Sequence, residues 1–478
     1  MRRSKDQFAV AAIEPIPSAA PVDAVVVSFS RQPDSVILQS VQFSPDQGRY
    51  SVVAARPVEI VQVSSQAAAD PIDALSDRDR RYPRVAPSTP TLPFAGGWIG
   101  FVAYEAGLRG ERVLPRRIPD LGQPLLRFGL YDAAAVYDHL DRRWFAVAVD
   151  WPRGAGIIRP PVRERLESIR TRVESAKPPA VPTTSAVRDG AMVDAIPNMT
   201  PEAYRERVAR CSRYIEAGDV YQVNLTQRFA VPTSASPMEN YRRLRAANPA
   251  PFAAMLTYDG CAILSASPEL FLRLDRGVVT TRPIKGTRPR VGVAERDEAA
   301  IRSLCASEKE RAELTMIVDL LRNDIGRVCA PGSVRVVEAA RIEEHPTVFH
   351  RVATIRGELR PDCGPMDLLR ATLPGGSVTG APKIRAMQII QELEPTPRGV
   401  YCGSIGWIGL DGALSFSLAI RTMVQTANQV FVYAGGAVVA DSDPQQEYDE
   451  IIAKATGMFR ALRCRAPNEA PDLQEAPA

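Results

Sequence analysis

A segment rich in proline, serine and threonine divides this 478-residue sequence into two unequal parts. It runs from residue 177 to 200 and reads KPPAVPTTSAVRDGAMVDAIPNMT, a composition typical of a linker. We therefore expect an N-terminal region at 1–176, a linker-like segment at 177–200 and a second region at 201–465. The tail at 466–478 lacks the apolar residues that a packed core needs and is predicted to be disordered.

Local patterns predict regular elements on both sides of this segment. Apolar alternation and helical spacing predict strands at 24–29, 144–151 and 220–229, and helices near 161–176 and from an N-cap at Thr200 to a stop at Gly218. The stretch FAGGWIGFVAYEAG, residues 94–107, is an exception because its glycines cluster beside aromatic residues. The first part is thus predicted to consist mainly of strands.

Charge and cysteine content limit the classes of partner. The net charge is +4 and the arginines are spread along the chain, which argues against a nucleic-acid-binding protein. The seven cysteines form no CxxC pair and there are only three histidines, so a zinc site is not expected. The scattered, odd number of cysteines indicates a protein of a reducing compartment. No run approaches the roughly 18 apolar residues of a membrane span, and Glu14 interrupts the apolar run near the N-terminus. We expect a soluble cytoplasmic protein without nucleic-acid or membrane partners.

Two predicted helices each carry a pair of glutamates one turn apart. In SEKERAELTMIVDLLRNDIG the pair is Glu310 and Glu313, and in DSDPQQEYDEIIAKA it is Glu447 and Glu450. Two carboxylates from separate helices, with room for waters and a substrate oxygen, are what Mg²⁺ commonly takes in proteins. The two helices together therefore form a candidate magnesium site.

Three of these glutamates also have a purely structural explanation. Ser307 and Glu310 fit a capping box, and Glu447 suits the first turn of its helix. Glu450 could pair with Lys454, four residues further along the same helix. Spacing alone leaves both interpretations open.

Two glycine-rich stretches offer backbone amides to an anionic ligand. LPGGSVTGAPKIRAM places Ser377 and Thr379 before a helix-like run, and VYAGGAVVADSD places Gly435 and Gly436 after a strand. Exposed amides and helix N-termini bind carboxylates or phosphates, although glycine pairs more often only make turns. Neither stretch matches a P-loop or a dinucleotide-binding fingerprint.

The stretch RPIKGTRPR, residues 282–290, contains one of only six lysines among 59 basic residues. Arginine stays protonated at physiological pH, whereas a partly buried lysine amine can lose its proton and act as a nucleophile or a base. Lys285 is therefore a candidate nucleophile. The alternative is one more exposed cation in a basic turn.

Seven motifs in their order resemble the chorismate-utilising enzymes, which include the large components of anthranilate and aminodeoxychorismate synthases and the isochorismate and salicylate synthases. The motifs are SASPELF, RPIKGTRPR, ERAELTMIVDLLRNDIGRV, PGGSVTGAPKIRAMQII, YCGSIGWIG, SFSLAIRTM and YAGGAVVADSDPQQEYDEIIAKA. The resemblance is dense from about Tyr204 to Met458, with FAGGWIGFVAYEAG as its main earlier landmark. It implies an α/β (α+β) body of two packed antiparallel sheets with helices outside. Residues 201–465 would then form the chorismate-binding catalytic region, and the linker-like segment would divide the sequence without dividing the fold.

The resemblance implies a metal site and a substrate site. Glu313 and Glu450 would hold Mg²⁺ against the ring carboxylate of chorismate, with Glu310 and Glu447 supporting them. The expected substrate-binding residues are Gln222, His350, Ser377, Thr379, Tyr401, Arg421, Gly435, Gly436 and Ala437.

Ala437 departs from the family pattern, and His350 has a second, purely structural explanation. Ala437 stands where the family usually has a further glycine, and it would alter the amide cradle if the turn needs a positive φ there. His350 could instead be a buried histidine satisfied by a backbone group.

Lys285 distinguishes the members of the family. Anthranilate and isochorismate synthases read PIAGT at this point, whereas PIKGT is typical of aminodeoxychorismate synthases. The isochorismate and salicylate enzymes place a lysine base where this chain has Gln222, and the LLES feedback motif of anthranilate synthases is missing. The resemblance therefore implies a transferase that aminates chorismate at C4, giving 4-amino-4-deoxychorismate for para-aminobenzoate and folate synthesis.

The implied chemistry uses Glu269, in SPELF, as the acid for loss of the C4 hydroxyl and Lys285 as the nucleophile at C2. Ammonia would then displace the lysine by adding at C4. No cysteine lies in a GxCxG nucleophile turn, so the ammonia would come from a separate glutamine amidotransferase subunit in a heterodimer. The alternatives are anthranilate synthase component I and a chorismate-binding paralogue without catalysis.

Overall fold

The structure is a computed structural model that describes residues 8–43, 47–86, 92–152, 155–178 and 193–467. Most of the predicted linker, at 179–192, and most of the predicted tail, at 468–478, lie outside the described residues. Within the described part of the linker, two short strands form at Val193–Asp194 and Ile196–Pro197.

Most strands belong to two large sheets, and every strand pair within them is antiparallel. In order, the larger sheet contains β1 (Val10–Ile16), β8 (Arg143–Asp150), β7 (Ala133–Asp138), β3 (Tyr50–Ala54), β2 (Val36–Gln39), β12 (Phe252–Tyr258), β13 (Cys261–Ser267), β22 (Thr422–Gln425), β23 (Gln429–Val438), β11 (Gln222–Pro232) and β10 (Ile196–Pro197), with β19 (Gly380–Ala381) also on β11.

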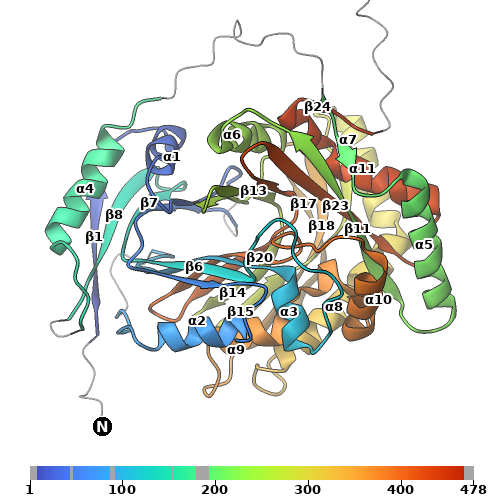
Figure 1. Cartoon of the computed structure of the whole chain (residues 1–478), viewed down its shortest axis with the longest axis horizontal. Helices are drawn as coiled ribbons and strands as arrows, with labels where there is room; N and C mark the ends of the chain where they lie inside the picture. Colours follow the sequence, from blue (N-terminus) through green and yellow to red (C-terminus); the bar gives the residue numbers. More distant parts are fainter. Residues whose placement is uncertain (1–7, 44–46, 87–91, 153–154, 179–192, 468–478) are drawn as a thin grey trace, which may run out of the picture.

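The smaller sheet lies below the larger one in Figure 1. In order, it contains β16 (Ile284–Pro289), β18 (Val348–Glu358), β15 (Val278–Arg282), β14 (Leu270–Asp275), β21 (Leu414–Leu418), β20 (Ser404–Gly409), β5 (Gly97–Val102), β6 (Leu126–Tyr131) and β4 (Glu59–Val63), with β17 (Arg335–Glu344) also on β18. A small separate ladder joins β24 (Cys464–Arg465) to β9 (Val193–Asp194) in parallel.

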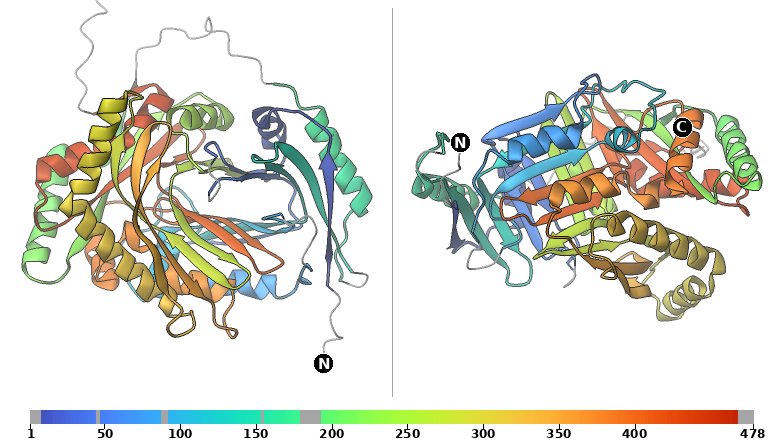
Figure 2. Two further views of the ribbon diagram at one scale, coloured as in Figure 1. Left: turned by 180° about the vertical axis from the view of Figure 1, so that it is seen from behind. Right: turned by 90° about the horizontal axis from the view of Figure 1, so that it is seen from below.

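Helices cover the outer faces of the two sheets (Figures 1 and 2). They are α1 (Val22–Ser30), α2 (Pro71–Asp79), α3 (Tyr104–Gly110), α4 (Val162–Glu174), α5 (Pro201–Glu216), α6 (Pro237–Ala247), α7 (Ala294–Ala306), α8 (Glu308–Gly326), α9 (Pro365–Thr372), α10 (Lys383–Leu393) and α11 (Pro444–Leu462). α6 and α11 pack against strands of the larger sheet, and α8 packs against β16, β17 and β18 of the smaller one. Among the helices of the described residues, none is both long and apolar enough to cross a membrane.

The core lies between the facing sheets. Phe101 of β5 and Tyr258 of β12 bring their rings to 5.6 Å across this interface, and the buried side chains of both sheets join one apolar cluster. Burial of this apolar surface is the main favourable contribution to the free energy of folding. The expected pair of packed antiparallel sheets with helices outside is confirmed.

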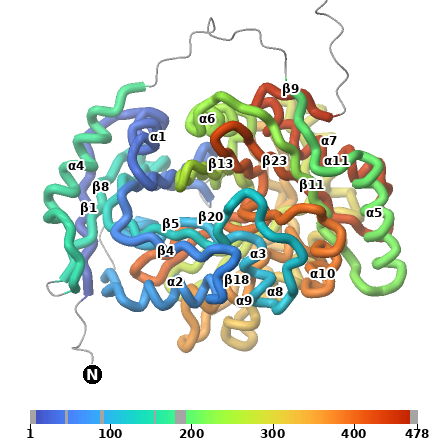
Figure 3. Tube along the Cα trace, in the orientation of Figure 1, coloured from blue at the N-terminus to red at the C-terminus, as the bar shows by residue number. Residues whose placement is uncertain are grey.

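Both sheets mix strands from before and after the linker-like segment. β2 pairs with β12 in the larger sheet, and β5 pairs with β20 in the smaller one. The trace in Figure 3 shows β5 beside β20, although they come from opposite ends of the sequence. The linker-like segment therefore joins two stretches of chain that build the same sheets.

The strand predicted at 24–29 is wrong, because these residues form α1. AVVVSF is rich in β-branched residues, which favour strands in isolation. In the fold, however, Ala24, Val25, Val26 and Phe29 are buried in a helix that begins directly after Pro21. Tertiary packing outweighs a weak local preference here. The other elements named in the sequence analysis form close to their predicted positions.

Candidate active site

Lys285 lies on β16, at the edge of the smaller sheet, and its side chain is 13% exposed. Its Nζ is 3.9 Å from Glu313 Oε2 on α8. Burial lowers the pKa of Lys285, nearby Lys454 lowers it further, and Glu313 and Glu269 act in the opposite direction. The interpretation of Lys285 as an exposed cation in a basic turn is therefore wrong, since it is a largely buried lysine in a strand.

Glu269 lies between β13 and β14 and is buried. Burial raises its pKa to about 7, while the Ser377 side chain, Lys285 and the Ile284 amide act in the opposite direction. A carboxyl group with this pKa is partly protonated near neutral pH and can donate a proton. Glu269 and Lys285 are close enough for their charges to influence each other.

The glutamate pairs of α8 and α11 lie near one another. Lys309, at the start of α8, is 3.8 Å from Glu447 Oε1 on α11. Glu313 and Glu450 both act against the lowering of the pKa of Lys285, so the charges of carboxylates on both helices influence that amine. A Cβ on Gly436 would lie 3.0 Å from Glu447 Oε2 and 3.9 Å from Glu450 Oε1, so β23 passes directly beside the α11 pair.

Only half of the capping box predicted for α8 forms. Ser307 Oγ accepts a hydrogen bond from the Glu310 amide, but the Glu310 side chain does not return to Ser307. Instead, Glu310 Oε1 accepts a hydrogen bond of 2.7 Å from Arg288 of β16, and Glu310 Oε2 lies where it would be 3.0 Å from a Cβ on Gly286. The capping-box interpretation is therefore wrong for the Glu310 side chain, whose carboxylate is directed toward the strand that carries Lys285.

Two carboxylate oxygens in this region are buried without a hydrogen-bond partner. They are Glu310 Oε2 and Glu447 Oε2. Unpaired buried oxygens are costly and often mark the place of a ligand or ion. Glu310 and Glu447 therefore each present an unpaired oxygen of the kind that a hard divalent cation prefers.

The glutamates do not form a closed protein cage. Within the described residues, no three Asp, Glu, His or Cys side chains are close enough together to hold a metal. Mg²⁺ usually takes one or two protein carboxylates and fills its remaining positions with waters and substrate oxygens. The donor set fits that mode of binding.

Lys454 was considered from the sequence only as a partner for Glu450. The pair does form, with Nζ 2.6 Å from Glu450 Oε1. Lys454 Nζ also donates to the Gly435 carbonyl oxygen at 3.0 Å, and its own carbonyl oxygen accepts a hydrogen bond from Arg421. Partial burial acts to raise the pKa of Glu450, whose side chain is 47% exposed, but the charge of Lys454 keeps that pKa below its usual value. The rarity of lysine in this chain was the available signal for a role at the site.

The expected substrate-binding residues Tyr401 and Arg421 differ in exposure, since Tyr401 is buried and Arg421 is half-buried. Tyr401 is buried and stacks on Tyr433, with ring centroids 5.1 Å apart. Burial lowers the pKa of Arg421, and nearby Tyr401 acts in the opposite direction. The two side chains therefore interact electrostatically in the same region.

His350 lies on β18 opposite Thr287 of β16. Its Nδ1 is 2.9 Å from Thr287 Oγ1, and its ring packs edge-on against His345. Burial lowers the pKa of His350 to about 3, and His345 and Arg421 act in the same direction. The imidazole is therefore neutral, and its partner is a side-chain hydroxyl rather than the backbone group considered above.

The segment before α10 brings two hydroxyls to the site. The Ser377 side chain lies near enough to Glu269 to act against the rise in its pKa, whereas Thr379 Oγ1 donates to the carbonyl oxygens of Gly375 and Gly376 at 3.1 and 3.2 Å. Thr379 thus holds the shape of its own segment. Gln222, at the start of β11, is fully buried, and both polar atoms of its amide lack a partner, so it can bind a small polar ligand.

Gly435, Gly436 and Ala437 do not form a turn. All three lie within β23, paired with Thr226, Leu225 and Asn224 of β11. Ala437 is not among the residues with positive φ, so the concern about a side chain at this position does not apply. β22 reaches only as far as Val432 along β23, so among the described strands none pairs with the edge opposite β11 at these residues.

Two sizeable cavities lie away from these residues. One, of about 640 Å³, lies beside α4 and is bordered by Arg163 and Arg172. The other, of about 450 Å³, lies between the sheets and is lined by Leu38, Phe252 and Trp407, among others. Neither is lined by any of the expected site residues, so the candidate site is defined by its converging side chains.

Comparison with known proteins gives consistent matches over nearly the whole chain. The family described as chorismate binding enzyme matches residues 39–460. Aminodeoxychorismate synthase component 1 of Klebsiella aerogenes is 38% identical over 449 residues, covering 91% of this chain and 95% of that protein. Anthranilate synthase component 1 of Streptomyces coelicolor is 38% identical over 452 residues, covering 93% and 87%. The crystal structure of anthranilate synthase component I from Streptococcus pneumoniae superposes with a TM-score of 0.74 at 32% identity, covering 93% of this chain and 98% of that one.

Proposed function

Because this chain belongs to the chorismate-binding enzyme family, we propose that it replaces the C4 hydroxyl of chorismate with an amino group, giving 4-amino-4-deoxychorismate. The two relatives named above differ in product and are equally identical to this chain, so identity does not select between them. The observation that carries the proposal is Lys285, which stands in PIKGT and is a largely buried amine with a lowered pKa.

In the first half of the reaction, Glu269 donates a proton to the C4 hydroxyl, which leaves as water. The neutral amine of Lys285 forms a bond to C2 as the two ring double bonds shift. The raised pKa of Glu269 and the lowered pKa of Lys285 favour the protonation states that this step needs. The result is an enzyme-bound ring whose mass is that of chorismate less one water.

In the second half, ammonia bonds to C4, the double bonds shift back, and the bond from C2 to the lysine nitrogen breaks. The Glu269 carboxylate can take the proton that the added nitrogen releases. Lys285 returns as an amine, and the net change is chorismate plus ammonia to the amino compound plus water. The unpartnered amide of Gln222 provides an acceptor and a donor without supplying a base for water.

Substrate binding is assigned to the surrounding residues. Glu313 and Glu450, supported by Glu310 and Glu447, would hold Mg²⁺, which supplies positive charge opposite the ring carboxylate. Arg421 and Tyr401, with the amides of residues 435–437, bind carboxylate oxygens of the substrate. Ser377, Thr379 and His350 complete the lining, with Ser377 in contact with the acid and His350 neutral.

The nitrogen source is proposed to be a separate glutamine amidotransferase subunit that forms a heterodimer with this chain. Both relatives are named as component 1 of their synthases, and none of the seven cysteines here lies in a GxCxG turn. The product would be the precursor of para-aminobenzoate and therefore of folate.

We expect the isolated chain to consume chorismate with ammonium and Mg²⁺ but not with glutamine. The product should be the non-aromatic 4-amino compound, identified by mass spectrometry, and an added lyase should convert it to para-aminobenzoate. Addition of a matching amidotransferase subunit should restore the use of glutamine.

Three other outcomes would change the assignment. Fluorescent anthranilate as the main product would identify the chain as an anthranilate synthase component. Turnover of glutamine by the isolated chain would contradict the proposed partner. Thermal stabilisation by chorismate and Mg²⁺ without any turnover would identify a binding protein without catalysis.

A further inference from the structure

Arg398 lies between α10 and β20 and forms one of the most buried ion pairs of the described residues. Its Nη2 is 2.6 Å from Glu394 Oε1 and its Nε is 2.9 Å from Glu394 Oε2. The side chains of Arg398 and Glu394 are 2% and 5% exposed. Neither residue was singled out from the sequence, and neither takes part in the chemistry proposed above.

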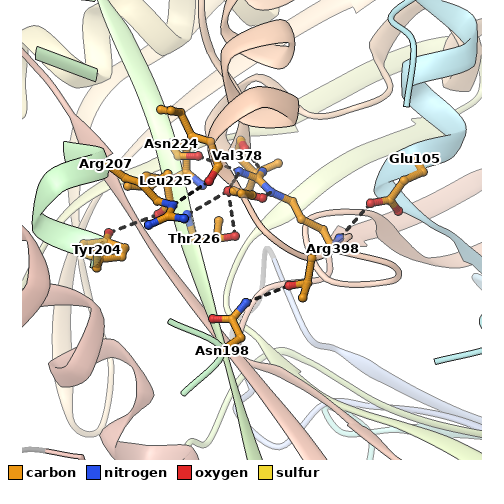
Figure 4. Close-up of polar contacts among 12 residues, drawn as sticks. Glu105, Asn198, Tyr204, Arg207, Asn224, Leu225, Thr226, Val378 and Arg398 are labelled. Carbon is orange, nitrogen blue, oxygen red and sulfur yellow. Dashed lines mark hydrogen bonds and ion pairs between the residues drawn. The ribbon is translucent and has the colours of Figure 1, made fainter. Parts of the chain in front are cut away.

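The Arg398 side chain connects two segments that line the candidate site (Figure 4). Its Nη1 donates to the carbonyl oxygen of Val378 at 2.7 Å, and its Nη2 donates to that of Asn224 at 2.6 Å. Val378 lies between Ser377 and Thr379. Asn224 lies two residues from Gln222, so one guanidinium fixes the backbone beside all three expected substrate-binding residues.

Glu394 extends the same network along β11. Its Oε1 accepts hydrogen bonds of 2.9 Å from both the amide and the hydroxyl of Thr226. Thr226 pairs with Gly435, and Asn224 pairs with Ala437. The ion pair therefore also supports the strand behind the proposed carboxylate-binding amides of β23.

Glu105 of α3 fixes the backbone of Arg398 itself. Its Oε1 accepts a hydrogen bond from the Arg398 amide at 2.8 Å, and its Oε2 accepts one from the Gly399 amide at 3.0 Å. Tyr104 adds a hydrogen bond from its amide to the Gly399 carbonyl oxygen and places its ring 4.5 Å from the guanidinium. These contacts fix the turn that leads directly into Tyr401, and they come from the stretch FAGGWIGFVAYEAG.

We propose that Arg398 and Glu105 are positioning residues that hold the segment around Ser377, the start of β11 and the turn before Tyr401 in the geometry that binds substrate. Backbone groups are fixed in each segment, so loss of either side chain displaces several substrate contacts at once. A displacement of about 1 Å at a reacting site can reduce activity roughly 100-fold. The inference rests on the proposed function only in that chorismate is the substrate, and it is independent of the product.

The test replaces Glu105 with glutamine and Arg398 with lysine. Glu105→Gln keeps the side-chain volume but offers a single carbonyl oxygen to two amides. Arg398→Lys keeps the charge opposite Glu394 but cannot donate along three directions as a planar fork. We expect the KM for chorismate to rise roughly 10- to 100-fold in both variants. Initial rates are measured as loss of chorismate, so that an error in the assigned product leaves the comparison intact.

Arg165→Lys is the matched control. Arg165 and Asp132 form another buried ion pair, 2.7 Å apart with side chains 8% and 0% exposed, among β7, β8 and α4. This variant should lower the melting temperature and leave the KM unchanged, because loss of folded protein reduces the apparent kcat but not the KM. A KM that stays at the parent value in Glu105→Gln, with only the melting temperature reduced, would overturn the proposal.

The test still gives a result if a variant does not fold or if the parent chain has no turnover. If Arg398→Lys does not fold, Glu105→Gln and Arg165→Lys still provide the comparison. If the parent chain binds chorismate without turnover, its dissociation constant measured by calorimetry in the presence of Mg²⁺ replaces the KM. The same rise in Glu105→Gln supports the proposal, and the absence of a rise contradicts it.

Discussion

Replacing Lys285 with arginine should reduce ammonia-dependent consumption of chorismate by roughly 10³-fold or more. Arginine keeps the positive charge opposite Glu313 but does not lose its proton near neutral pH, so it cannot form the bond to C2. Lys285 is largely buried, and its pKa is lowered mainly by that burial. The charge can be replaced in this variant, but the nucleophile cannot.

The intermediate offers a second and more direct measurement. Intact-mass analysis after incubation with chorismate and Mg²⁺, without ammonia, should show the mass of chorismate less one water added to the parent chain. Peptide mapping should place it on Lys285, and Lys285→Arg should lack it. Lys177→Arg, at an exposed position, controls for lysine replacement in general. Full activity of Lys285→Arg, or an adduct on another residue, would exclude Lys285 as the nucleophile.

Replacing Glu313 or Glu450 with glutamine should raise the Mg²⁺ concentration for half-maximal activity by roughly 10- to 100-fold or more. Each change removes one negative charge and keeps the size of the side chain, so the fold should be unaffected. The measurement is a Mg²⁺ titration of the rate at fixed chorismate, together with the melting temperature of each variant.

Controls for this prediction come from the same helices. Asp319→Asn on α8 and Asp449→Asn on α11 remove exposed carboxylates of those helices, Asp449 being the immediate neighbour of Glu450. Neither should change the Mg²⁺ requirement. If the Mg²⁺ concentration for half-maximal activity is the same in Glu313→Gln, Glu450→Gln and the parent chain, these carboxylates do not bind the metal.

Glu310→Gln should have a smaller effect than Glu313→Gln and should act at the site rather than at the start of α8. Glu310 accepts a hydrogen bond from Arg288, and its second oxygen is buried without a partner. The helix cap is supplied by Ser307 through the Glu310 amide, which the substitution retains. The melting temperature should therefore change less than the Mg²⁺ requirement.

Local signals were sufficient for most of the elements that the sequence analysis named. Thr200 and Ser307 each cap a helix as expected, because an N-cap depends only on the three or four residues that follow it. The Val-rich run in α1 was misassigned because strand preference is weak and packing reverses it. Gly435 and Gly436 were expected after a strand, but they lie within β23. A pair of glycines in the sequence does not show whether a neighbouring strand continues to pair with them.

Residue types and motifs identified residues of the site, but they did not predict the contacts between them. The sequence identified Lys285 and the four glutamates, but it could not show that Glu310 pairs with Arg288 rather than with its own helix terminus. Arg398 was missed entirely, because its partner Asn224 is 174 residues away in the sequence. Contacts at such separation depend on the topology of the sheets, which no local pattern encodes.

The interleaving of early and late strands has a consequence for synthesis on the ribosome. β2, at Val36–Gln39, pairs with a strand that begins at Phe252, and β5 pairs with one that begins at Ser404. At roughly 5–20 residues per second, the nascent chain waits roughly 10–40 s for the first of these partners. During that interval β2 presents an apolar strand edge with unpaired backbone groups, which other chains can pair with. Nascent chains that stop before Phe252 should therefore aggregate or be retained by chaperones.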